Sequence, residues 1–212
     1  GAYDGSSTEV GNSSTNLMTA GRIQVDFWDP EAGYYLNGTY YGQRNLLAIG
    51  LAAQTQAGDV VPAVIGTDGT VIDDLTTKTA SSFDFLLERM TGNGSAVSLE
   101  AEVVRYDGLG GYPTVPGSAY QTLTGGFLLA AYLFPEMSGP GQFEILAKYG
   151  LATFSQDRNA AYPDFDQKTS EVNFNYILNE FNARVMVFFK KTDYTAVRMD
   201  DTQVGVGLQI QI

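Results

Sequence analysis

The chain has 212 residues, a formal net charge of −12, and neither histidine nor cysteine. The lack of both residue types excludes disulfides, thiolate or imidazole metal sites, and catalysis by a cysteine or histidine. The negative charge argues against nucleic acid as a partner, because phosphate binding needs clustered lysine and arginine. The longest apolar run, residues 127–134, is far shorter than the roughly 20 residues that a membrane-spanning helix needs, so a membrane location would require strands.

Alternation of apolar and polar residues dominates the chain after a Gly-, Ser-, Thr- and Asn-rich start at residues 1–16, which predicts a loop. Alternation with period two is the pattern of a strand with two unlike faces. The tyrosine-rich segment after the first strand, with Tyr34, Tyr35, Tyr40 and Tyr41, fits either a short hairpin arm or an interfacial connection. Nine strands are predicted, at residues 21–28, 46–56, 81–90, 97–106, 120–134, 143–151, 171–178, 183–190 and 203–212.

The second of these strands has one face of small residues, Ala48, Gly50 and Ala52. Such a face predicts tight packing or a neighbour that passes close to the backbone.

The connections between the strands alternate in length. Tight turns at residues 91–95, 135–141 and 179–182 are interleaved with longer loops at 57–78, 107–119 and 156–167. Short turns on one rim and long loops on the other are typical of outer-membrane barrels. One face of nearly every strand is also free of charge, with aromatic residues near its ends. We therefore predict an all-β fold, an antiparallel transmembrane β-barrel, with these residues facing lipid: Val97, Leu99, Val185, Val187, Val204, Val206 and Leu208.

A soluble β-sandwich or a lipocalin-like barrel is the alternative, because alternating strands with aromatics also describe those folds. The predicted strands are longer than the usual 5–6 residues, and their polar faces carry Glu, Asn and Gln at mid-strand. Both features favour the membrane barrel.

Two blocks of sequence resemble a known family. The segment at residues 22–43, continued by Leu-Leu-Ala-Ile-Gly at 46–50, resembles segments in the C-terminal part of bacterial outer-membrane porins, and the hairpin at 133–144 is similar to turns of that family. The resemblance implies a trimeric or monomeric pore in the outer membrane, surrounded by lipid and lipopolysaccharide, through which small polar solutes diffuse. Ile212 departs from the aromatic residue with which such barrels often end.

The strand count adds a further expectation. Single-chain bacterial barrels have an even number of strands, whereas nine are predicted here. We therefore expect residues 1–212 to form one domain that is the C-terminal portion of a larger barrel, with residues 1–16 as an outer loop, and not to close a ring alone.

Charged residues on the faces opposite the apolar ones are the candidate pore lining. Glu100 and Glu102 share one face, and the acids of the strand at 81–90 should lie beside them, away from a basic cluster around Arg184 and Lys190. Because acids exceed bases, we expect a mild preference for cations. The predicted pore-lining residues are Arg22, Asp26, Asp84, Glu88, Glu100, Glu102, Glu144, Lys148, Glu171, Arg184 and Lys190.

No enzymatic activity and no cofactor are expected. Asp84 with Glu102 could do acid–base work, but pore-lining charges are the favoured interpretation. The acidic pairs Asp164–Asp166 and Asp200–Asp201 could bind calcium, yet they lack a calcium-loop spacing, so solvated loops are favoured. Residues 108–111 are glycine-rich but do not form a nucleotide-binding loop, since no helix follows.

A second class of function is a structural or adhesive outer-membrane barrel that holds partner proteins through its loops. One example is a sheath for a cytochrome, which would have to be a separate chain because no haem-attachment motif is present.

Overall fold

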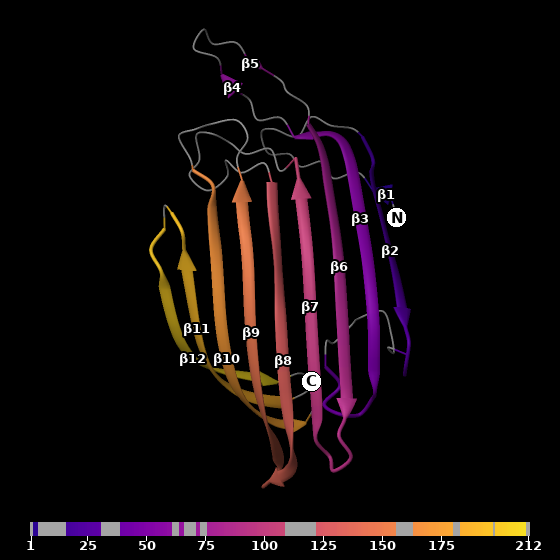
Figure 1. The fold of residues 1–212 in the computed structure, drawn as a ribbon, viewed down its shortest axis with the longest axis vertical. Coiled ribbons are helices and arrows are strands. Elements are labelled where there is room, and N and C mark those ends of the chain that lie inside the picture. The colour runs from indigo at the N-terminus through magenta and orange to yellow at the C-terminus, as the bar shows by residue number, and fades with distance from the viewer. Residues whose placement is uncertain are drawn as a thin grey trace.

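The computed structural model describes residues 2–3, 16–30, 39–60, 64–65, 71–72, 76–108, 122–155, 163–179, 183–196 and 198–210. Ten strands form one antiparallel sheet in the order β1-β2-β3-β6-β7-β8-β9-β10-β11-β12, and β4 and β5 pair separately (Figure 1). The chain therefore runs up and down as a meander. The strand bounds are β1 Ala2–Tyr3, β2 Met18–Asp26, β3 Leu46–Val60, β4 Val64–Ile65, β5 Val71–Ile72, β6 Thr76–Met90, β7 Ala96–Asp107, β8 Thr122–Ser138, β9 Gly141–Ser155, β10 Phe165–Asn179, β11 Ala183–Tyr194 and β12 Asp201–Ile210.

All nine predicted strands are present, as β2, β3 and β6 to β12. Several are longer than predicted, because the pairing continues where the apolar alternation has already faded. β10, for example, begins at Phe165, ahead of the apolar stretch. Two elements were missed: β1, within the segment predicted as a loop, and the β4–β5 hairpin, within the long connection after β3. Tyr34, Tyr35, Ile212 and most of the loops at 1–16, 107–119 and 156–167 lie outside the described residues.

The tight turns are described at two places, 91–95 between β6 and β7 and Gly139–Pro140 between β8 and β9. The second is shorter than predicted because β8 continues to Ser138 through an irregularity between Leu133 and Met137. Gly92, Gly94 and Gly139 adopt positive φ in these turns, a conformation that glycine reaches without the steric cost of a Cβ. Both turns lie at one end of the sheet, called here the short-turn end (the lower end in Figure 1).

The strand register sorts side chains into two faces. Asp84 lies opposite Glu102, Leu86 opposite Glu100, and the alternate residues Phe83 and Phe85 share the other side. Followed from strand to strand, the pairing places all eleven predicted pore-lining residues on one side, called the polar face. The opposite side is called the apolar face.

Burial runs opposite to that of a soluble half-buried sheet. On the apolar face Leu51 and Phe174 are 58% exposed and Val206 is 75% exposed, whereas Glu88 on the polar face is fully buried. A small cluster of buried apolar residues, Ala96, Leu133 and Ile177, also lies on the polar face. Each described strand contacts only its neighbours in the sheet, so no second layer of strands covers the apolar face.

The sheet does not close into a barrel. Within the described residues β2 pairs with β1 and β3, and β12 pairs only with β11. The sheet of the described residues is therefore open, and the lower ends of β10, β11 and β12 curve across toward the lower ends of β7 and β8 in this view (Figure 1). This openness agrees with the expectation that these residues do not complete a ring by themselves. The described residues contain no helix that is long and apolar enough to cross a membrane.

Candidate functional site on the polar face

An arginine–aspartate pair crosses three strands of the polar face. Arg22 on β2 donates from Nη1 to Asp84 Oδ2 (2.5 Å) and from Nη2 to Asp84 Oδ1 (2.7 Å), and Asp84 lies on β6. The strand between them is β3, where a Cβ on Gly50 would lie 2.3 Å from Arg22 Nη2 and 2.5 Å from the Asp84 carboxylate. The guanidinium therefore passes directly over Gly50, which explains the small face predicted for this strand. We call this bidentate pair the clasp.

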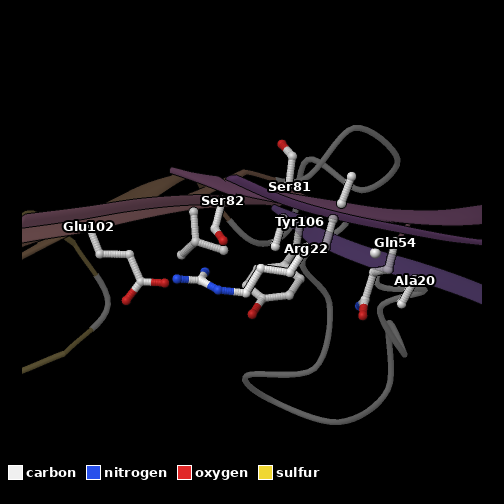
Figure 2. A pocket seen from close by; sticks show the side chains of 12 residues that line it. Ala20, Arg22, Gln54, Ser81, Ser82, Glu102 and Tyr106 are labelled. Carbon is white, nitrogen blue, oxygen red and sulfur yellow. The ribbon is translucent and has the colours of Figure 1, made fainter. Parts of the chain in front are cut away.

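An open hollow of about 390 Å³ lies beside the clasp (Figure 2). Small side chains such as Ala52, Ala80 and Ser82 line it, together with the larger Arg22, Gln54, Glu102 and Tyr106. Figure 2 shows Arg22 and Glu102 pointing toward one another from opposite sides of the hollow. A guanidinium, a carboxylate, an amide and a phenol thus meet over a floor of small residues, which suits transient contact with a small polar solute.

The acidic patch predicted from the sequence is formed. Glu102 lies directly opposite Asp84, and Glu100 lies two residues before Glu102 on the same strand face. Asp84 is held by Arg22, whereas Glu102 has no ion pair among the described residues. The two adjacent carboxylates therefore differ: the charge of Asp84 is balanced by the clasp, and that of Glu102 is presented to the hollow.

The basic residues lie on other strands of the same face. Glu171 on β10 is directly opposite Lys148 on β9 and Lys190 on β11, so charges of opposite sign alternate across three strands. Lys148 Nζ also sits 4.0 Å above the centre of the Phe127 ring, a cation–π contact. These three charged residues line a second hollow of about 230 Å³, to which Gly150 also contributes. Acids thus predominate on β6 and β7, whereas on β9 to β11 two lysines flank one glutamate.

Three of the predicted residues form a different kind of cluster, at the short-turn end. Glu88 is 0% exposed and Glu144 is 5% exposed, so both share the polar face but neither faces open solvent. Glu144 accepts a hydrogen bond from Asn175 Nδ2 (2.7 Å), and Arg184 donates to Gln209 Oε1 (2.7 Å). They are covered because residues 39–45, the last part of the connection from β2 to β3, fold over this end of the polar face. We call residues 39–45 the strap.

Glu88 is the main attachment of the strap. Its Oε1 accepts from the backbone N–H of Gly42 (2.7 Å), and its Oε2 accepts from the N–H of Tyr40 (2.8 Å) and from Thr39 Oγ1 (2.9 Å). Ser98 Oγ donates a fourth bond to Oε2 (3.1 Å). The sequence left the role of Tyr40 and Tyr41 open. The structure shows a connection that folds inward onto the polar face.

The acidic residues considered for calcium have local roles. Asp166 accepts from Thr153 Oγ1 (2.8 Å), Asp200 accepts from the N–H of Tyr194 (2.9 Å), and Asp201 accepts from Gln203 Nε2 (2.5 Å). Among the residues that the structure describes, no group of three or more acids is placed to hold a metal ion.

Comparison with known proteins identifies no relative: no family model matches the chain, and no curated protein or solved structure matches it.

Proposed function

We propose that the chain is part of an outer-membrane porin, whose apolar face contacts lipid and whose polar face lines a water-filled channel for small polar solutes. The observation that carries the proposal is the distribution of side chains between the two faces. Large apolar side chains are exposed on one face, while every predicted pore-lining charge lies on the other. In water such a sheet would expose its apolar face, whereas in a bilayer the same face is solvated by lipid.

The height of the charge-free band supports a membrane location. On the apolar face of β7, Val97, Leu99, Ala101 and Val103 are followed by Arg105. From Val97 to Val103 the strand rises by roughly 20 Å, close to the roughly 25 Å of a lipid-facing band. Arg105 then pairs with Asp107 (2.8 Å), so charge reappears where the band would end. β11 follows the same plan, with Lys191 and Asp193 (2.6 Å) beyond Phe189.

A mild cation preference follows from the charges of the polar face. Outside the cluster of Glu88, Glu144 and Arg184, the predicted lining has five acids and three bases, a net charge of −2. A channel wall with excess negative charge raises the local concentration of cations. The clasp removes one acid and one base from this balance, which leaves Glu102 as the acid presented to the hollow.

Conductance of the full-length protein in planar lipid bilayers tests the proposal. Discrete current steps, with a reversal potential in a potassium chloride gradient that shows cation preference, are expected. A silent bilayer would reject the channel and favour the structural or adhesive scaffold. Clear anion selectivity would reject the cation preference but not the channel.

A further inference from the structure

The strap is fixed at both of its ends. At the β3 end, the N–H of Asn45 donates to Asp29 Oδ2 (2.9 Å), and Asn45 Oδ1 accepts from the N–H of Met90 (3.0 Å). At the other end, Glu88 accepts hydrogen bonds from Thr39, Tyr40 and Gly42. The strap is therefore held against β6 at both of its ends, and it is not a freely moving loop.

The backbone of the strap is shaped for this attachment. Tyr41 has φ of 50° and Gly42 has φ of 75°, so two successive residues are in the left-handed region. The N–H groups of Tyr40 and Gly42 both reach the Glu88 carboxylate as a result, and bonds from N–H groups to a charged acceptor are among the stronger ones. Glycine is required at position 42 for two reasons: its φ is positive, and a Cβ there would lie 3.1 Å from Ala96 Cβ.

Tyr41 connects the strap to strands on the opposite part of the polar face. Its ring packs against the cluster of Ala96, Leu133 and Ile177, which belong to β7, β8 and β10. Its hydroxyl accepts from Arg184 Nη1 (3.5 Å) on β11. A segment that enters β3 therefore touches β11 on the far side of the sheet, which is possible only because the sheet is curved. The strap fills the concave side of the short-turn end.

We propose that the strap forms the narrowest part of the channel and sets its size limit, and that Glu88 is the residue that positions it. The inference rests on the proposed channel function. A solute that passes along the open hollows near Glu102 and Lys148 meets the strap before it leaves at the short-turn end. The strap is a fixed constriction, because lifting it would strip a buried carboxylate of three hydrogen bonds at once.

Single-channel conductance and the uptake of neutral sugars of increasing size into liposomes test this inference on the full-length protein. Tyr41→Gly keeps the left-handed backbone and removes the spanning ring, so conductance should rise by about 1.5-fold or more and larger sugars should enter. Gln43→Trp adds bulk at an exposed strap position and should lower conductance. Leu123→Ala, on the same face near the end of β8 away from the strap, is the matched control and should leave the size limit unchanged.

Glu88→Gln tests whether Glu88 positions the strap. Its control is Glu102→Gln, which removes the same charge from an acid that is not attached to the strap. Glu88→Gln should widen the size limit, whereas Glu102→Gln should change ion selectivity alone. An unchanged size limit in Tyr41→Gly and Gln43→Trp would overturn the inference while leaving the channel standing. If Tyr41→Gly fails to fold, Gln43→Trp decides. A wild-type protein without conductance would instead reject the proposed function itself.

Discussion

The substitution Val187→Lys distinguishes an apolar face that contacts lipid from one that contacts water. Val187 lies on the apolar face of β11, opposite Phe174 on β10 and Val206 on β12, and it is 45% exposed. The nearest charged residue on the same strand face is Lys191, four positions away, and the band ends four positions away on the other side, at Ala183. Each interval is roughly 13 Å at the rise of a strand, so Val187 lies at the middle of the band.

The two environments predict different costs for this substitution. At an exposed position in water, a change to lysine usually alters the free energy of unfolding by less than about 0.5 kcal/mol. At the bilayer midplane a lysine on the lipid face costs about 2–4 kcal/mol. We expect the larger value, measured by denaturant unfolding of the full-length protein reconstituted in phospholipid vesicles.

Ile210→Lys is the matched control, on the apolar face of β12 near the short-turn end of the band, where Ile210 is 65% exposed. Near the interface the cost should fall to about 0–1 kcal/mol, because lysine reaches the headgroups there. Equal and negligible costs at both positions would contradict the assignment of this face to lipid.

Three further predictions concern packing and titration. Gly50→Ala should break the clasp, because a Cβ at position 50 would occupy the space through which the Arg22 guanidinium reaches Asp84. The coupling energy between Arg22 and Asp84, measured in a double-mutant cycle, should then fall from about 1 kcal/mol or less to near zero. Persistence of the coupling would contradict the passage of the guanidinium over Gly50. Gly205→Val should destabilise the protein by about 1–3 kcal/mol in denaturant unfolding, because a Cβ there would lie 2.5 Å from the Phe188 ring, and an unchanged midpoint would count against this contact. Burial raises the pKa of the Tyr41 hydroxyl above its ordinary value of 10.0, so the folded state keeps the proton that the unfolded state loses, and stability should fall as pH rises above about 10. Tyr41→Phe should flatten that alkaline decline in unfolding titrations, and an equally steep decline in the variant would assign it to other groups.

The sequence predicted the strands and their faces because both depend on local pattern. Phe83, Phe85 and Leu87 alternate with Asp84, Leu86 and Glu88, and the short turn at 91–95 then fixes the register of the next strand. The pairing of Asp84 with Glu102 follows from these two facts alone. The small face of β3 also correctly predicted a neighbour that passes close to the backbone, although only the structure identifies Arg22 as that neighbour, above Gly50.

The strap could not be predicted in this way. Glu88 is bound by residues 46 to 49 positions away, so its burial depends on how a distant connection folds. On its strand Glu88 looks like Asp84, another acid on the polar face, and nothing local distinguishes an anchoring acid from an exposed one. The left-handed conformation of Tyr41 is equally hidden, because a non-glycine residue rarely adopts it.

Whether the sheet closes into a barrel could likewise not be predicted from the local sequence pattern. Alternation and connection lengths are the same in a closed barrel and in an open sheet with two free edges, so they do not say whether the edge strands meet. Closure depends instead on strand number and tilt, which are properties of the whole ring. The open sheet was expected from the odd number of predicted strands and from the loop-like start, yet β1 brings the sheet to ten strands, so the strand count did not itself decide closure.

The burial pattern finally indicates what this sheet needs in order to be stable. Nine apolar residues are buried among those that the structure describes, and three of them, Ala96, Leu133 and Ile177, form a cluster against which Tyr41 of the strap packs. By contrast, large apolar side chains such as Leu128, Phe174 and Leu208 are each more than half exposed on the apolar face. Burial of apolar surface is the main favourable term in folding, and nine buried apolar residues are few against the conformational entropy of ten ordered strands. In the proposed porin, lipid would cover the apolar face, and this proposal accounts together for the charge-free band, its charged ends and its exposed side chains.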